Sequence, residues 1–321
     1  MRALVTGGTG FIGSNLVFHL LDQGHEVIAT GSAGEQDLSK FPVRMLPEDF
    51  SAIDWRTLGP VDVVFHQAAI NDTTILDRDL MFQVNVENSR QLFLQAVARG
   101  CRRIVYASSC SVYGDLPAPY RENGPLHPLN PYAESKVALD EQAMEIAATH
   151  SGITVVGLRY SNVYGPRENH KGKRATMITQ LAQQMLRGNP RIFQWGEQKR
   201  DYLYVSDAVR ANLQALEARE SSILNCGSGH ATSFNELVSL LNEVLGVERV
   251  PEYFENPHRG RYQDHTECDL TLAREKIGFV PAIDIGEGIR RYAASGFLVP
   301  LGRNHSLRLD RSPATVEAEH E

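Results

Sequence analysis

Tyr132 and Lys136 stand four residues apart at the start of a predicted helix, and this pair could carry out acid–base chemistry. Residues separated by four positions lie on one face of a helix, so the phenol and the ammonium would be neighbours. A phenol has a pKa of about 10 and is a poor base at neutral pH, but a nearby cation favours its ionised form. The pair could therefore take a proton from an alcohol while hydride leaves the same carbon. The same spacing is also common on solvated helix faces.

The segment ASSCSVYG, residues 107–114, supplies hydroxyl groups at the end of a predicted strand. Ser109 could hold the alcohol oxygen that Tyr132 deprotonates. Cys110 follows directly, and a thiol with a pKa of about 8.5 can both give and accept a proton close to neutrality. The alternative interpretation of Cys110 is a small thiol packed in the protein core.

Three glycines, Gly7, Gly10 and Gly13, are spaced three residues apart in TGGTGFIG. They come directly after the strand predicted at 2–6 and open the helix predicted at 13–23, which is the context that a dinucleotide-binding loop requires. Glycines let the backbone approach a pyrophosphate, and the start of the helix supplies N–H donors. A flexible turn is the alternative for the same glycines.

The end of the second predicted strand has Gly31 and Ser32 where dinucleotide-binding folds usually place an acidic residue that binds the adenosine ribose. No arginine follows closely to bind a 2′-phosphate. The sequence therefore favours NAD and leaves NADP open.

Strands and helices alternate through the first half of the chain, and this order predicts a parallel sheet with right-handed crossovers. Strands are predicted at 2–6, 26–30, 61–66, 103–107, 154–159, 191–193, 202–205 and 223–226, and helices at 13–23, 85–99, 137–149, 176–187, 233–245 and 270–277. We therefore expect an α/β fold: a Rossmann-type, doubly wound sheet with a smaller C-terminal substrate-binding domain. Residues 1–161 and about 201–230 are assigned to the dinucleotide-binding domain and 162–200 with 231–300 to the second. The polar stretch 301–321 is predicted to be disordered.

The composition of the 321 residues is ordinary for a globular protein, with 42% hydrophobic and 22% charged residues. The formal net charge of −7 argues against general binding to nucleic acid or to membrane surfaces. The four cysteines form no C-x-x-C pair, so we expect neither a metal site nor a disulfide framework. The absence of a signal-like segment predicts a cytoplasmic protein. A homodimer is expected, in which helices 85–99 and 137–149 could pair.

Seven segments together resemble the extended short-chain dehydrogenase/reductase family, and among its members the nucleotide-sugar epimerases and dehydratases. The matching segments are TGGTGFIG (6–13), HQAA (66–69), ASSCSVYG (107–114), PYAESK (131–136), LRYSNVYGPRE (158–168), RDYLYVSD (200–207) and NPHRGRYQDHTECD (256–269). The resemblance implies that NAD and a nucleotide-diphosphate sugar bind. It implies catalytic roles for Ser109, Cys110, Tyr132, Lys136 and Lys171. It implies cofactor contacts from Gly7, Gly10, Phe11, Ile12, Gly13, Gly31, Ser32, Ala68, Ala69, Asn85, Tyr132 and Lys136, and substrate contacts from Ser111, Asn162, Arg200 and Arg259.

Within the family, NDTTILDRD (71–79) and PRENHKGK (166–173) resemble the ADP-heptose 6-epimerases. In those enzymes the lysine that matches Lys171 is thought to be a second acid or base; a phosphate or solvent contact is the alternative. Gly31 and Cys110 depart from that pattern. The similar 4,6-dehydratases carry Asp and Glu at the positions of Cys110 and Ser111. In Cys110 and in its overall length, the chain resembles the UDP-N-acetylglucosamine 5,6-dehydratases of tunicamycin biosynthesis.

The sequence therefore leaves three reactions open. The one favoured by Cys110 is dehydration of a UDP-hexosamine: oxidation at C4, loss of the C5 proton and the C6 hydroxyl, and return of the hydride. The second is epimerisation, at C4 of a UDP-hexose or at C6 of an ADP-heptose. The third is a dinucleotide sensor without catalysis, against which Ser109, Tyr132 and Lys136 argue.

Overall fold

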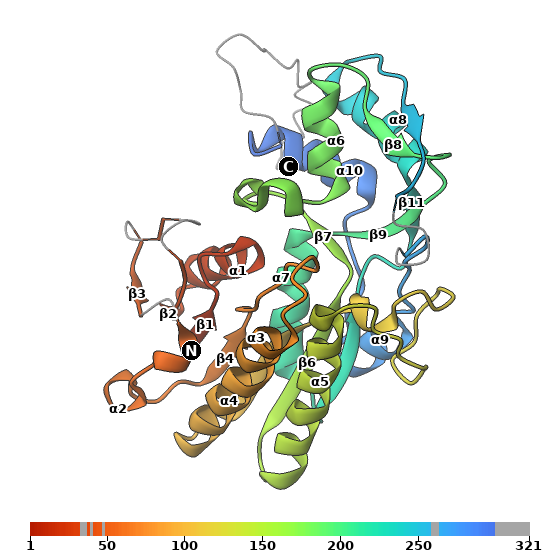
Figure 1. The fold of residues 1–321 in the computed structure, drawn as a ribbon. Helices are drawn as coiled ribbons and strands as arrows, with labels where there is room; N and C mark the ends of the chain where they lie inside the picture. The colour runs from red at the N-terminus through yellow and green to blue at the C-terminus, as the bar shows by residue number, and fades with distance from the viewer. Residues whose placement is uncertain (33–36, 39–40, 47–48, 258–262, 299–321) are drawn as a thin grey trace, which may run out of the picture.

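A seven-stranded parallel sheet lies at the centre of the computed structural model, which describes residues 1–32, 37–38, 41–46, 49–257 and 263–298 (Figure 1). Its strand order is β10-β6-β5-β4-β1-β2-β3, and every neighbouring pair runs parallel. The predicted Rossmann-type α/β fold is thus confirmed. The strands are β1 (Arg2–Thr6), β2 (Glu26–Ala29), β3 (Val43–Met45), β4 (Val63–His66), β5 (Arg103–Ser109), β6 (Thr154–Tyr160) and β10 (Ser222–Cys226).

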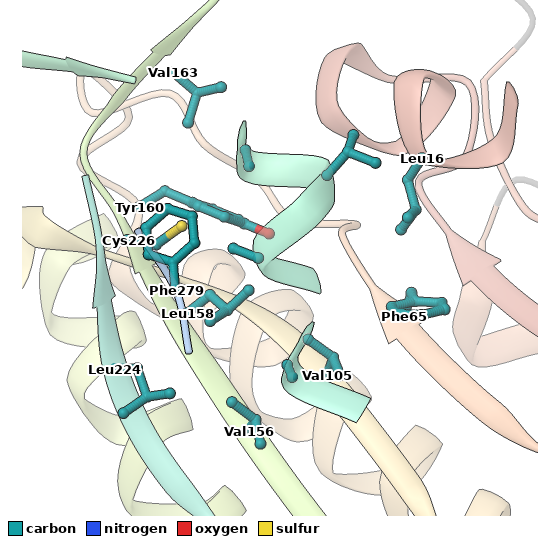
Figure 2. Close-up of a cluster of buried hydrophobic side chains, with 14 of the residues drawn as sticks. Leu16, Phe65, Val105, Val156, Leu158, Tyr160, Val163, Leu224, Cys226 and Phe279 are labelled. Carbon is teal, nitrogen blue, oxygen red and sulfur yellow. The ribbon is translucent and has the colours of Figure 1, made fainter. Parts of the chain in front are cut away.

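Successive residues of the central strands enter two different hydrophobic cores, because side chains alternate between the faces of a sheet. Leu4 packs with residues of α4 (Ser89–Ala98) and α5 (Pro131–Thr149), which lie next to each other along one face (Figure 1). Val5 packs on the other face with residues of α1 (Phe11–Asp22) and α7 (Val205–Gln214). Figure 2 shows part of this second core, where Leu16, Phe65 and Val105 approach one another. Because helices cover both faces of the sheet, the ends of its strands are held in place. The site residues come directly after those strand ends in the sequence.

A smaller part of the structure lies beyond the carboxyl ends of the strands (Figure 1). It holds the sheet β11-β9-β7, made of β7 (Asn162–Tyr164), β9 (Lys199–Tyr204) and β11 (Ala231–Ser233), and the pair of β8 (Arg191–Phe193) with β12 (Glu252–Phe254). The helices α6 (Met177–Met185), α8 (Phe234–Leu245) and α10 (Ile285–Ala294) share a third hydrophobic core there. The remaining helices are α2 (Trp55–Leu58), α3 (Arg78–Phe82) and α9 (Thr271–Ile277). The predicted domain boundaries stay a prediction.

The largest differences between predicted and observed helix bounds are at the starts of two helices. Helix α5 begins at Pro131 rather than at 137, because the Asn130 side chain accepts a hydrogen bond from Ala133 N at 2.9 Å and proline is favoured at the first helical position. The helix predicted at 85–99 starts as a π-helical turn, Gln83–Asn88, before α4. Residues 301–321 lie outside the described part. No described helix combines the length and the apolar character that crossing a membrane requires.

Candidate active site

A cavity of about 620 Å³ opens where β1, β4, β5 and β6 end, between the large sheet and the smaller part. The carboxyl ends of parallel strands are where open α/β sheets bind ligands. The predicted site residues that line this cavity are Gly7, Gly10, Phe11, Ile12, Gly13, Ala68, Ala69, Ser109, Tyr132, Lys136, Asn162 and Lys171. Residues distant in the sequence are thus brought to one place by the strand ends.

The glycine loop fits a dinucleotide, as two close approaches of its backbone indicate. Gly7 has a φ of +65°, and a Cβ there would lie 2.8 Å from Ala68 N. A Cβ on Gly13 would lie 2.0 Å from the carbonyl oxygen of Gly7. The first turn of α1 contains no acidic residue, and no side chain caps its amide groups. The loop therefore presents a bare, glycine-lined backbone and the positive end of a helix, which suit a pyrophosphate.

Ser109, Tyr132 and Lys136 form the centre of the cavity wall. Burial raises the pKa of the Tyr132 phenol, and a hydrogen bond with the Ser109 side chain acts in the opposite direction. Lys136 is almost completely buried and donates from Nζ to the carbonyl oxygen of Ala107 at 2.7 Å. Burial lowers the pKa of Lys136 to about 8, and the nearby carboxylate of Asp140 opposes this shift. The lysine Nζ lies 5.8 Å from the centroid of the Tyr132 ring.

Lys171 and Asn162 reach the cavity from the smaller part of the structure. The Nζ of Lys171 lies 3.6 Å from Glu168 Oε1 and 5.4 Å from the centroid of the Phe11 ring. Asn162 donates from Nδ2 to the carbonyl oxygen of Asp201 at 3.2 Å. The cavity therefore holds a half-buried phenol on the sheet side and a half-buried ammonium on the side of α6.

Residues 3–227 match the model of the NAD-dependent epimerase/dehydratase family. The chain belongs to this family. Its activity is that of a NAD-dependent nucleotide-sugar epimerase/dehydratase of the extended short-chain dehydrogenase/reductase type, which confirms the predicted class of enzyme. The prediction of NAD as cofactor is also confirmed.

Three proteins of known name are similar over nearly the whole chain. An ADP-L-glycero-D-manno-heptose-6-epimerase of Alkalilimnicola ehrlichii is 38% identical over 314 residues, covering 90% of this chain and 95% of the relative. The crystal structure of the enzyme of the same name from Helicobacter pylori is 33% identical with a TM-score of 0.82, covering 92% of this chain and 95% of that chain. MoeE5 in complex with UDP-glucuronic acid and NAD is 32% identical with a TM-score of 0.82, covering 92% of this chain and 98% of that chain.

Gly31 stands where dinucleotide-binding folds usually have an acidic residue. It packs against the glycine loop and does not line the cavity. A Cβ on Gly31 would lie 2.1 Å from Thr9 Oγ1, so an acidic side chain does not fit there in this arrangement. Ser32 does not line the cavity either. In this arrangement the Thr9 side chain occupies the space that a side chain at position 31 would need.

Asn85 is another predicted cofactor residue that the structure places behind the cavity wall. It is fully buried in the π-helical turn, accepts a hydrogen bond from Ile70 N at 2.8 Å and donates to Ile70 O at 2.9 Å. Ile70 lines the cavity, in the segment that follows β4. Asn85 therefore positions the backbone of that segment, and the side chain lies away from the cofactor space.

Cys110, predicted to be catalytic, does not line the cavity. Its thiol is 5% exposed, and its Sγ lies 3.1 Å from the carbonyl oxygen of Arg159 and 3.2 Å from Cys268 Sγ. Strand β5 ends at Ser109, and Cys110 begins the 3-10 turn Cys110–Tyr113, in which its side chain packs in the hydrophobic core while Ser109 lines the cavity. Ser111 donates from its N–H to Ser109 Oγ at 3.2 Å and lies outside the cavity lining.

The two predicted arginines are not part of the described cavity. Arg200 donates from Nη1 to the carbonyl oxygen of Lys199 at 2.8 Å, and its guanidinium lies 5.8 Å from the centroid of the Phe234 ring. Arg259 lies outside the described residues. Contacts of both side chains with a diphosphate stay predictions.

Several cavity residues were missed by the sequence analysis. Gln67 lies inside the quoted HQAA segment, and its Nε2 donates to Asn212 Oδ1 at 3.0 Å. Asn212 in turn donates to the hydroxyl of Tyr160 at 2.6 Å. Thr176 and Gln180 line the opposite wall, and their spacing of four in a predicted helix was the signal that could have identified them.

Proposed function

We propose that this protein is a NAD-dependent epimerase that inverts one carbinol carbon of a nucleotide-diphosphate sugar. The observation that carries the proposal is the presence of two candidate proton-transfer groups, Tyr132 and Lys171, on the lining of one cavity with Ser109. An epimerase removes hydride from one face of a carbon and returns it to the other. The alcohol oxygen then needs one proton-transfer group in each of its two configurations, and the two groups on this cavity lining meet that need.

Tyr132 acts as the base for one configuration. Ser109 donates a hydrogen bond to the alcohol oxygen while the phenolate of Tyr132 takes its proton. Lys136, on the same helical face, favours the phenolate by its charge. The hydrogen bond with Ser109 offsets part of the effect of burial on the pKa of Tyr132. NAD, when bound on the glycine loop, accepts the hydride from the carbon and gives it back.

Lys171 acts for the other configuration. After the ketone has turned its other face to the cofactor, the ammonium of Lys171 protonates the oxygen as the hydride returns. ADP-heptose epimerised at C6 is the substrate to test first, because two similar proteins are named as ADP-heptose 6-epimerases. The resemblance of PRENHKGK (166–173) to those enzymes supports the same choice.

The test is incubation of the purified protein with ADP-heptose, UDP-hexoses and UDP-hexosamines, followed by mass spectrometry and NMR. An unchanged mass with a new NMR spectrum supports epimerisation. A product lighter by one water means dehydration and contradicts the proposal. Failure to turn over any of these sugars contradicts it too.

The nucleotide diphosphate supplies a prediction about Arg259, the arginine that the family resemblance assigns to it. We expect Arg259→Ala to raise KM with little change in kcat. The charge of the diphosphate stays the same throughout the reaction, so the lost contact weakens substrate and transition state equally. Steady-state kinetics measure both constants. A fall in kcat at unchanged KM contradicts this role.

Dehydration stays a second candidate because of where Cys110 stands. In the similar dehydratases, the catalytic acid stands at the position of Cys110. Cys110 also lies close enough to Tyr132 that a negative charge on its sulfur would raise the pKa of the Tyr132 phenol. The thiol faces the core, so elimination requires its side chain to rotate toward the cavity.

We expect Cys110→Ala and Cys110→Ser to turn over within about threefold of the wild type, since an inward-facing thiol contributes packing and no proton transfer. The measurement is the rate of product formation together with the entry of solvent deuterium into the sugar. A loss of about a hundredfold in both variants, with unchanged melting temperature, would instead favour dehydration.

A further inference from the structure

Glu168 is a fully buried carboxylate beside the candidate active site, and the proposed chemistry has so far given it no part. Its side chain has no exposed area. It follows Arg167, whose φ of 76° lies in the left-handed region that residues other than glycine rarely adopt. The guanidinium of Arg167 stacks over the Phe18 ring at 3.9 Å while Glu168 turns inward. A buried charge reached through strained backbone is costly to folding and so indicates a use.

Three neutral donors hold the carboxylate of Glu168 against the start of α6. Its Oε1 accepts from Thr176 N at 2.7 Å, and its Oε2 accepts from Thr176 Oγ1 at 3.0 Å and Thr179 Oγ1 at 2.8 Å. These bonds explain the position of the side chain. They engage both oxygens, so Glu168→Gln loses part of this set together with the charge, because an amide has only one acceptor oxygen.

The charge of Glu168 has a partner in Lys171, at 3.6 Å between Oε1 and Nζ. The pair is only partly exposed, with 21% of the Lys171 side chain accessible. On its other side, the ammonium lies over the ring of Phe11, the first residue of α1 and part of the glycine loop segment. The ammonium of Lys171 is thus held between a carboxylate and an aromatic ring, at the cavity wall.

The geometry points to Glu168 as the positioning residue of Lys171: its negative charge holds the ammonium at the cavity wall for proton transfer to the sugar. The inference rests on the proposed function, in which Lys171 protonates the ketone oxygen. Because Thr176 and Thr179 tie Glu168 to α6, the helix that lines the opposite wall sets the place of the ammonium as well.

The test is Glu168→Gln, which keeps the length and an acceptor oxygen and removes the charge. We expect kcat for epimerisation to fall roughly ten- to a hundredfold, because the Lys171 ammonium is no longer held in the orientation that proton transfer requires. KM should stay within about threefold, since Glu168 does not touch the sugar.

Two further variants separate positioning from stability. Thr179→Val removes one neutral donor to the same carboxylate and keeps the charge, so its kcat should fall far less than that of Glu168→Gln. Lys171→Met should be as slow as the double variant with Glu168→Gln, because Glu168 acts through Lys171. Effects that multiply in the double variant, or a Thr179→Val variant as slow as Glu168→Gln, overturn the inference.

Melting temperature and retained NAD report whether Glu168→Gln folds. If it does not, Glu168→Asp keeps the charge on a shorter side chain, and its effect on kcat must disappear in the Lys171→Met background; an effect that persists there overturns the inference. A wild-type protein that forms no epimer refutes the proposed function. A wild-type epimerase whose Glu168 and Lys171 variants are independent refutes only the role of Glu168.

Discussion

The Tyr132→Phe variant is expected to lose turnover by about a hundredfold or more while it keeps its fold and its NAD. The phenol lies on the cavity wall beside the Ser109 hydroxyl, and burial raises its pKa. No other hydroxyl stands on that face of α5 with a lysine four residues behind it. Removing the oxygen takes away the proton acceptor and leaves the aromatic ring to fill the same space.

Tyr160→Phe is the matched control for this prediction. Tyr160 lines the same cavity, and its hydroxyl accepts from Asn212 Nδ2 at 2.6 Å, so the control removes a hydroxyl of equal size from the same wall. We expect it to cost far less turnover than Tyr132→Phe. The measurement is kcat with the true substrate, beside the NAD content of each protein. Near-wild-type rates in Tyr132→Phe would show that another group is the base.

The pair of Tyr132 and Lys136 could be predicted because its geometry is local. Both side chains stand on one helix, and the four-residue spacing alone puts them together. The start of that helix was placed too late, since the apolar periodicity begins only at Val137, whereas Asn130 and Pro131 start the helix through capping. The capping signal was in the sequence and was overlooked.

Cys110 and Asn85 show where a one-dimensional interpretation fails. The chain leaves β5 at Ser109 and turns at Cys110, so adjacency to Ser109 does not bring the Cys110 thiol to the cavity wall. Asn85 lies close behind the cavity wall, but its side chain forms hydrogen bonds with the backbone of Ile70. In both cases the orientation depends on tertiary packing, which a single sequence does not record.

Glu168 stood inside a quoted motif, LRYSNVYGPRE, and still had no predicted role. A glutamate in a polar segment is expected to be solvated, because charged side chains are rarely buried without partners. Lys171 meets it locally, three residues further along the chain, whereas Thr176 and Thr179 reach it after the chain turns at Gly172, whose φ is +54°. The contacts of Glu168 with these residues could therefore be recognised only from the folded structure.

The Gly13→Ala variant is expected to lose its bound NAD and to be destabilised. A Cβ at this position would lie 2.0 Å from the carbonyl oxygen of Gly7 and 3.0 Å from the Cα of Gly8. Both neighbours are backbone, which cannot move aside as the end of a side chain can, so the loop and α1 must separate. Forcing an atom into packed structure costs about 1–3 kcal/mol, and here the displaced groups are the ones that form the pyrophosphate cradle.

Gly188→Ala is the matched control, because a Cβ there meets no atom within 4 Å and its backbone is not in the left-handed region. Thermal unfolding of both variants, and quantitation of the dinucleotide released on denaturation, give the two quantities. We expect the control to match the wild type in both and Gly13→Ala to fall in both, with the loss of NAD exceeding what partial unfolding explains. A Gly13→Ala protein that keeps its full NAD content would show that the cofactor does not lie against this loop.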